Sequence, residues 1–167
     1  MKKIIEDDKI IIFLKKADIS FDLKDEEKLK DYFQKLLLKL KNKIDLEDSS
    51  FYNIDVYSDE YYGYVLEITS NDIYYDYFNQ IDIQVNILKN LPFLYEVDYE
   101  YLINLDATYY KKGSKLYIKL NKKIDDIIFE ELIENSNIIY DDQVKKILKQ
   151  SKKVDYEKTS SCPSGQT

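Results

Sequence analysis

The sequence predicts an α+β fold in which an antiparallel sheet carries amphipathic helices packed on one face. Alternating apolar and polar residues, the pattern of half-buried strands, recur between residues 52 and 118. Stretches with apolar residues at every third or fourth position, the pattern of amphipathic helices, begin near Lys24, Ile124 and Asp142. With 44% hydrophobic and 34% charged residues, the chain of 167 residues has the composition of a globular protein.

The first expected elements are a short strand and a long helix. Ile10 to Leu14 is a run rich in β-branched residues, which favours a strand. Lys24 to Lys43 is expected to be helical, with an N-cap at Asp22 or Asp25. The apolar positions of this helix share one face: Leu29, Phe33, Leu36, Leu37, Leu40 and Ile44.

A hairpin and a further strand are expected next. Residues 52–57 and 64–69 are predicted to pair around a turn at Asp59 to Gly63, where Gly63 is expected to adopt a positive φ or a bulge. Residues 71–79 fit either a short helix or a loop. Residues 81–87 alternate as a half-buried strand, which Asn90-Leu91-Pro92 ends.

The remaining residues predict one more hairpin and two more helices. Residues 93–105 keep a period of two, which favours a strand to Val97, with a short helix from Asp98 as the alternative. Residues 109–118 predict a hairpin around Gly113. An edge strand is expected over residues 138–140, followed by a helix capped by Asp141 or Asp142. Between the 109–118 hairpin and this edge strand, an amphipathic helix is expected. Its apolar face is marked by Ile124, Ile127, Ile128 and Leu132.

Three regions are expected along the chain. Residues 1–90 form a β-α-β-hairpin-β module, and residues 91–153 add a β-hairpin and two helices. Residues 154–167 are predicted to be a disordered polar tail. The sequence leaves open whether the strands form one continuous sheet or two. A seam between two domains would lie at Asn90 to Pro92.

The residue types that the sequence lacks restrict its chemistry. The chain contains no His and, because all 25 basic residues are Lys, no Arg. Without His it lacks the commonest general base and the Ser-His and Cys-His nucleophile pairs. Its single Cys, Cys162, excludes a disulfide framework and a four-ligand zinc site built from Cys and His in one chain. We therefore expect a non-enzymatic protein with no cofactor.

The N-terminal residues predict no targeting or membrane segment. Glu6, Asp7 and Asp8 interrupt a basic start, and the apolar run at residues 10–14 is too short for a signal peptide core or a membrane span. We therefore expect a cytoplasmic protein without membrane association. Heavy use of Ile, Lys, Asn, Tyr and Asp is typical of an AT-rich bacterial genome.

Negative charge is concentrated in the middle of the chain. Residues 45–106 contain 14 acids and one Lys, a net charge of −13, whereas residues 1–44 and 107–167 each carry +3. The same region holds 11 of the 17 Tyr. One interpretation is that these residues form ordinary sheet surface and core. The other is an acidic, Tyr-rich binding face, which would attract basic partners and repel nucleic acid.

The residues expected to form that binding face lie at turns within the acidic region. Tyr supplies a large contact area at low entropic cost, and the neighbouring carboxylates would contact a basic surface. The candidates are Asp59, Glu60, Tyr61, Tyr62, Asp72, Tyr74, Tyr75, Asp76 and Tyr77.

Metal and phosphate sites are not predicted. Asp72, Asp76 and Asp82 would offer oxygen ligands to Mg²⁺ or Ca²⁺, but their spacing matches no calcium loop. The three lysines around Gly113 have no helix start or glycine-rich loop beside them, so a solubilising turn is the expected role. We therefore expect no metal site and no direct binding of nucleic acid.

The order of elements resembles the MecA-type adaptors of Gram-positive bacteria. The N-terminal likeness is the strand at residues 10–14, the helix at 29–40 and a hairpin ending Leu66-Glu67-Ile68-Thr69. The C-terminal likeness is the hairpin at residues 109–118 followed by helix, strand and helix. Residues 72–87 have no counterpart, and no acidic linker joins the halves. The resemblance implies a substrate-binding N-terminal domain and a C-terminal domain that docks on an unfoldase, and we assign no functional residue from it.

These observations predict an adaptor-like protein-interaction or regulatory module that binds a basic protein through the acidic, Tyr-rich face. A nucleic-acid mimic that inhibits a DNA-binding protein is the first alternative, because the same acids would imitate phosphates. A small enzyme or enzyme subunit that uses Asp, Lys or Tyr with Mg²⁺ is the second. The sequence leaves the formation of a homo-oligomer open.

Overall fold

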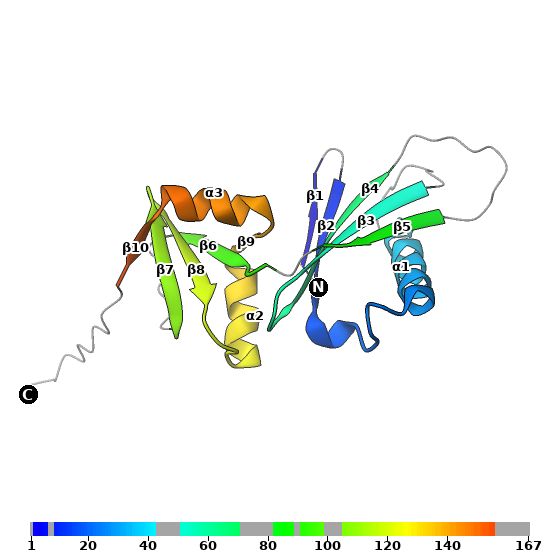
Figure 1. Ribbon diagram of the computed structural model, residues 1–167, viewed down its shortest axis with the longest axis horizontal. Helices are drawn as coiled ribbons and strands as arrows, with labels where there is room; N and C mark the ends of the chain where they lie inside the picture. Colours follow the sequence, from blue (N-terminus) through cyan, green and yellow to red (C-terminus); the bar gives the residue numbers. More distant parts are fainter. Residues whose placement is uncertain are drawn as a thin grey trace, which may run out of the picture. The chain divides into compact units, whose positions relative to one another are not determined.

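The chain forms two compact units, each built around its own five-stranded sheet (Figure 1). The units comprise Met1–Pro92 and Phe93–Thr167. The computed structural model describes residues 2–6, 9–42, 51–70, 82–88, 91–98 and 105–155. The predicted α+β class is confirmed, and the strands form two sheets rather than one. The boundary between the units directly follows Pro92, where the predicted seam ends.

The first unit consists of five strands, a short 3₁₀ helix and one α-helix. In chain order these are β1 (Lys2–Ile5), β2 (Lys9–Lys15), η1 (Lys16–Asp18), α1 (Glu26–Lys41), β3 (Phe51–Ser58), β4 (Gly63–Ser70) and β5 (Asp82–Ile87). The strand order in the sheet is β1-β2-β4-β3-β5. Both β2 and β3 pair antiparallel with β4, so they run in the same direction on either side of it. The helix α1 supplies the crossover that two such strands require.

Strand β5 departs from the antiparallel sheet that the sequence predicts, because it pairs in parallel with β3. Phe51 lies opposite Asp82, and the register continues to Val56 opposite Ile87. Alternation of apolar and polar residues determines which face of a strand is buried, but it does not determine the direction of the neighbouring strand. The error therefore concerns the pairing and not the strand itself.

The core of the first unit lies between α1 and one face of the sheet. The side chain of Asp25 accepts a hydrogen bond from the backbone N–H of Lys28 at 3.2 Å and caps the helix, as one of the two predicted caps. The helix buries Leu29, Phe33, Leu37 and Leu40. The strands contribute alternate residues to this core: Ile10, Ile12, Leu14, Tyr52, Ile54, Val56, Tyr64, Leu66, Ile68 and Ile83.

The second unit has five strands that pair only antiparallel. Its elements are β6 (Leu94–Asp98), β7 (Ala107–Lys112), β8 (Lys115–Leu120), α2 (Asp126–Glu134), β9 (Asn137–Ile139), α3 (Asp142–Gln150) and β10 (Lys152–Val154). The strand order is β10-β7-β8-β6-β9. The predicted hairpin around Gly113 is β7–β8, and Gly113 has φ of 60° in its two-residue turn. Only glycine adopts this backbone conformation at little cost.

Helices flank the second sheet on both faces, which corrects the expectation that helices pack on one face only (Figure 1). Helix α3 packs through Val144 on Leu94 and Tyr117. Helix α2 packs on the opposite face, where the rings of Phe129 and Tyr95 lie 6.0 Å apart in a T-shaped contact. Neighbouring residues of β6 and β8 point to opposite faces and are apolar on both, so both faces must be covered.

The buried face of α2 also differs from the one expected. Phe129, Leu132 and Ile133 are buried, whereas Ile127 is 77% exposed and Ile128 is 38% exposed. Both sets of residues repeat at helical spacing, and the sequence alone does not distinguish them. The prediction was wrong at Ile127 and Ile128 and right at Leu132.

Two edge strands were not predicted. Strands β1 and β10 are short, rich in Lys and without apolar alternation, which are the usual features of edge strands. Val154, which was expected to begin the disordered tail, lies in β10 opposite Tyr109. The rest of the expected tail, from residue 156 onward, lies outside the described residues, as do residues 71–79 and 99–104.

The last helix and its neighbours agree with the predicted order of elements. The expected edge strand is β9, and α3 follows it. Asp141 is the N-cap residue of α3, although its side chain makes no capping hydrogen bond. None of the helices in the described part of the chain is long and apolar enough to cross a membrane.

Candidate functional site

Four of the nine candidate residues form the turn between β3 and β4. These are Asp59, Glu60, Tyr61 and Tyr62, and the structure brings them together between β3 and the central strand of the first sheet, β4. The other five lie outside the described residues: Asp72, Tyr74, Tyr75, Asp76 and Tyr77. The β3–β4 turn is therefore the part of the predicted face that has a described geometry.

The carboxylate of Asp59 shapes this turn from within. Its Oδ1 accepts hydrogen bonds from the backbone N–H groups of Tyr61 at 2.9 Å and Tyr62 at 3.2 Å. The backbone N–H of Asp59 donates to the carbonyl of Gly63 at 3.0 Å. This is an Asx-turn, in which the side chain replaces a backbone acceptor. Asp59 is only 8% exposed, and these bonds offset the cost of burying its carboxylate.

A second anchor comes from the segment that follows β2. The backbone N–H of Lys16 donates to the carbonyl of Tyr62 at 2.9 Å, and its ammonium group donates to the carbonyl of Glu60 at 2.6 Å. The turn is thus attached at two carbonyls to a residue more than 40 positions away in the sequence. Nothing in the sequence of the turn indicated that Lys16 would bind it, and Lys16 was not among the candidate residues.

Gly63 fixes the base of the turn, for a different reason from the one expected. A Cβ atom at Gly63 would lie 2.1 Å from the carbonyl oxygen of Leu14. Among the described glycines only Gly113 has a positive φ, so of the two features expected at Gly63, a positive φ or a bulge, the positive φ was wrong. Glycine is required at position 63 because the backbone of β2 approaches so closely.

The turn exposes a small surface to solvent. Tyr62 is 5% exposed, and its ring makes a T-shaped contact with the ring of Tyr61, with 6.0 Å between the centroids. Tyr61 is 38% exposed, and Glu60 is exposed as well. Within the described residues, no ion pair is recorded for the carboxylate of Glu60. We call the exposed side chains of Glu60 and Tyr61 the turn surface.

Most of the described tyrosines of the acidic region belong to the core. Tyr52, Tyr57, Tyr64 and Tyr95 are all buried, together with Tyr62. For these residues the interpretation as sheet and core is the correct one. The tyrosine content of the region therefore supports a binding face only at Tyr61 among the described positions.

Strand acids of the first sheet are paired within the sheet. Asp55 lies directly opposite Glu67 on β3 and β4. The amide of Asn86 donates to Asp55 at 2.8 Å, and the ammonium of Lys9 lies 3.4 Å from Glu67. Burial lowers the pKa of Lys9, but the charges and hydrogen bonds of Glu67 and Glu6 outweigh it, so the pKa is raised. These carboxylates are thus engaged, whereas that of Glu60 is exposed.

Within the described residues of the second unit, a cluster of ionisable groups lies on the face that α3 covers. The ammonium of Lys115 lies 2.8 Å from Asp98 and 3.8 Å from Glu96, and Asn137 donates to Glu96 at 3.4 Å. Burial, followed by the hydrogen bond to Glu96 and its charge, raises the pKa of Tyr117 to about 12. Tyr117 is therefore protonated near neutral pH and acts as a hydrogen-bond donor, not as a base. The cluster joins β6, β8 and β9.

Metal ligands do not converge in the described part of the chain. No group of three His, Cys, Asp or Glu there could hold a metal ion. Of the three Asp considered for Mg²⁺ or Ca²⁺, Asp82 pairs with Lys30 at 3.1 Å and its Oδ1 accepts from the backbone N–H of Ile83. The other two, Asp72 and Asp76, lie outside the described residues.

No family model, curated protein or solved structure matches this chain. The resemblance to MecA-type adaptors therefore stays a prediction, and function has to be argued from the chain's own residues.

Proposed function

We propose that this protein is a non-enzymatic, adaptor-like interaction or regulatory module that binds a basic protein partner through the turn surface. The observation that carries the proposal is the anchored β3–β4 turn. It exposes the side chains of two consecutive residues, the carboxylate of Glu60 and the ring of Tyr61. The proposal includes the cytoplasmic location expected from the sequence.

Preorganisation of the turn supports this role. Binding costs conformational entropy when a loop must be ordered, and a loop held in place beforehand avoids part of that cost. Asp59, Lys16 and Gly63 hold the backbone of residues 59–63 by hydrogen bonds and close packing. The anchoring residues use their polar groups on the turn itself, so Glu60 and Tyr61 remain for a partner.

The chemistry of the two exposed side chains indicates the kind of partner. An exposed carboxylate without a recorded counter-ion favours a Lys or Arg on the other protein. Tyrosine adds apolar area with a polar hydroxyl and has few rotatable bonds, so it is frequent in protein contacts. A basic protein surface meets both requirements.

The proposal is tested by capture from a Gram-positive bacterial lysate with the tagged full-length chain at low and high salt. The double variant Glu60→Lys with Tyr61→Ser should lose a partner that the unmodified chain captures at low salt. The matched control is Glu27→Lys with Tyr61 intact, because Glu27 is an exposed acid of the same unit. Equal capture by the double variant would contradict the turn surface as the site. Displacement of the captured protein by duplex DNA would favour the nucleic-acid mimic instead.

A further inference from the structure

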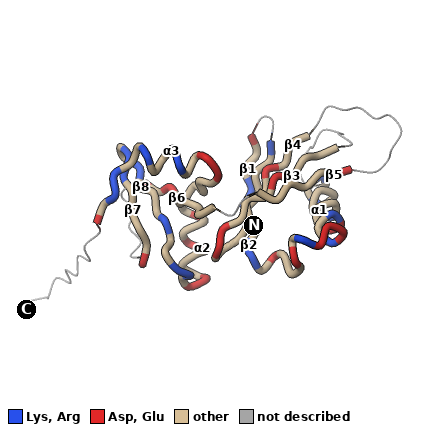
Figure 2. Tube along the Cα trace, viewed as in Figure 1, with Lys and Arg blue, Asp and Glu red and all other residues tan. Residues whose placement is uncertain are grey.

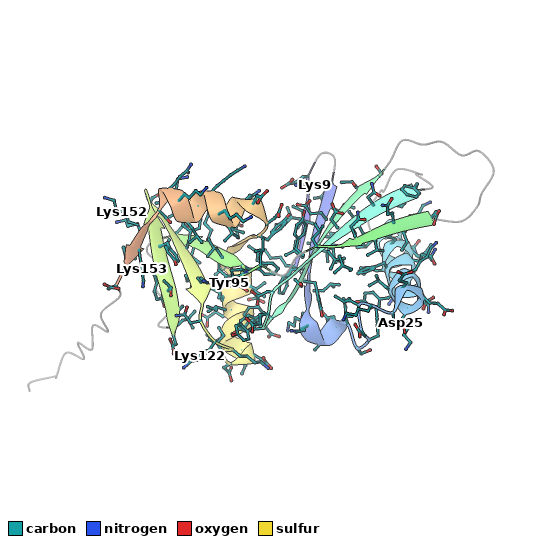
Figure 3. All side chains as sticks on the ribbon, in the orientation of Figure 1. Lys9, Asp25, Tyr95, Lys122, Lys152 and Lys153 are labelled. Atoms are coloured by element: carbon teal, nitrogen blue, oxygen red, sulfur yellow. The ribbon has the colours of Figure 1, made fainter. Side chains whose placement is uncertain are left out.

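Four exposed lysines gather along one edge of the second sheet. Lys111 and Lys112 end β7, and Lys152 and Lys153 belong to β10, where Figure 3 labels the latter two. Lys152 lies directly opposite Lys111 in the register, and Lys112 lies opposite Lys115. Like charges placed opposite each other destabilise a sheet, so pairing between these strands does not account for the lysines. We call these four residues the lysine edge.

Most lysines of this edge have no acidic partner among the described residues. Within the described part of the second unit, ion pairs hold Lys115, Lys122 and Lys145. None is recorded for Lys112, Lys152 or Lys153, and the ammonium of Lys112 donates to the amide oxygen of Gln150 at 2.5 Å. Figure 2 shows the resulting run of positive charge on β10. Three uncompensated cations at one edge favour an anionic partner.

Strand β10 also has backbone groups available for pairing. Strand β10 ends the strand order of its sheet, and within the described residues no strand pairs with its outer side. Such an edge presents backbone N–H and C=O groups to which an extended peptide can add as a further strand. Because neighbouring residues of a strand point to opposite faces, Lys152 and Lys153 would flank an added strand on both faces.

The same lysines disfavour a second copy of this chain as the added strand. Pairing of β10 with another β10 would bring lysines against lysines, which is a common protection of edge strands against self-association. A nucleic acid would supply anions but no peptide groups for the strand edge.

We propose that β10 is a docking edge for an extended, Asp- and Glu-rich segment of another protein, which pairs as an additional strand with its carboxylates beside Lys152 and Lys153. This site belongs to the second unit and is independent of the turn surface. A chain with both sites would join a basic partner to an acidic one.

The proposal is tested by fluorescence anisotropy with the full-length chain and a labelled 12-residue peptide of Glu-Glu-Val-Val repeats, which places carboxylates on both faces of an added strand. Lys152→Glu with Lys153→Glu should weaken binding about tenfold, because two attractive contacts become repulsive. The matched control is Lys123→Glu with Lys146→Glu, two exposed lysines of the same unit with the same change in charge. Equal weakening by both double variants would overturn the proposed site, leaving only a general charge effect.

A second pair of probes separates strand addition from simple charge attraction. The same peptide with an N-methyl group on every backbone nitrogen keeps its carboxylates but cannot donate main-chain hydrogen bonds from either edge, so it should bind much more weakly. Full affinity for the N-methylated peptide would overturn docking by strand addition. Tighter binding of a 12-nucleotide oligo(dT) than of the peptide would overturn the choice of an acidic protein segment. Far-UV circular dichroism and Tm confirm that each variant is folded.

Discussion

The two hairpins of this protein use the same strand arrangement but different ways of making a turn. In β3–β4, four residues are held by the carboxylate of Asp59 and by Lys16, and Gly63 presses against the backbone of Leu14. In β7–β8, two residues make the turn, and a Cβ atom at Gly113 would meet nothing within 4 Å. The first turn depends on contacts from another part of its unit, whereas the second depends on one backbone conformation.

This difference explains which charges each hairpin presents. At the acidic hairpin, Asp59 uses its carboxylate on the turn, so only part of the acidic run remains exposed. At the basic hairpin, the turn depends on the φ of Gly113, and Lys111 and Lys112 beside it are exposed. A run of charge in the sequence therefore does not by itself give the charge of the surface.

The largest expected effect is that of Gly63→Ala. The new methyl group would lie 2.1 Å from the carbonyl oxygen of Leu14, and backbone cannot move aside as a flexible side chain can. We expect the free energy of unfolding to fall by about 3 kcal/mol, as for severe overpacking. Urea denaturation of the full chain measures it. A loss no larger than that caused by Gly113→Ala would contradict the close approach.

Removal of the Asp59 carboxylate should have the next largest effect. Asp59→Ala leaves the N–H groups of Tyr61 and Tyr62 without their acceptor, which should cost about 2 kcal/mol of unfolding free energy. Partner capture should weaken as well, although Asp59 itself is buried. Asp59→Asn keeps an accepting oxygen and is the matched control. Equal destabilisation by Asn and Ala would mean that the charge, rather than the acceptor, stabilises the turn.

Gly113→Ala should destabilise the chain by about 1 kcal/mol, from backbone strain alone. The φ of 60° is unfavourable for alanine, but no neighbouring atom opposes the methyl group. Gly113→Asn should recover part of the loss, since Asn tolerates this conformation better. Thermal denaturation of the three proteins checks the order Gly, Asn, Ala, and an Ala variant as stable as the original would contradict the strained turn.

The smallest effect concerns alkaline pH and the second hairpin. Burial and Glu96 raise the pKa of Tyr117 from 10.0 to about 12, so the unfolded chain loses this proton at lower pH than the folded chain. The stabilisation is complete below pH 10 and is lost as the pH rises toward about 12. Tyr117→Phe should therefore flatten the fall in Tm between these values. A fall as steep as in the original chain would show that Tyr117 is not responsible.

The sequence predicted elements whose signal is local. Helix α1 follows from helical spacing, with Asp25 as one of the two predicted caps, and the β7–β8 hairpin follows from alternation around Gly113. Features that depend on distant residues were missed. The approach of Leu14 to Gly63, the parallel partner of β5 and the pairing of Lys152 with Lys111 involve positions tens of residues apart. Both residues of the turn surface, Glu60 and Tyr61, were among the nine candidates. The residues of the lysine edge were not.

The measurement that tests this account most directly is an NMR titration of the ¹⁵N-labelled full chain with two peptides, one rich in Lys and Arg and the other the Glu-Val peptide. The basic peptide is expected to shift the backbone amides of residues 59–63, where its cations would meet Glu60. The acidic peptide is expected to shift those of β10 and the end of β7. Shifts of one common set of amides by both peptides, or none at residues 59–63 with the basic peptide, would contradict the claim that the two hairpins serve partners of opposite charge.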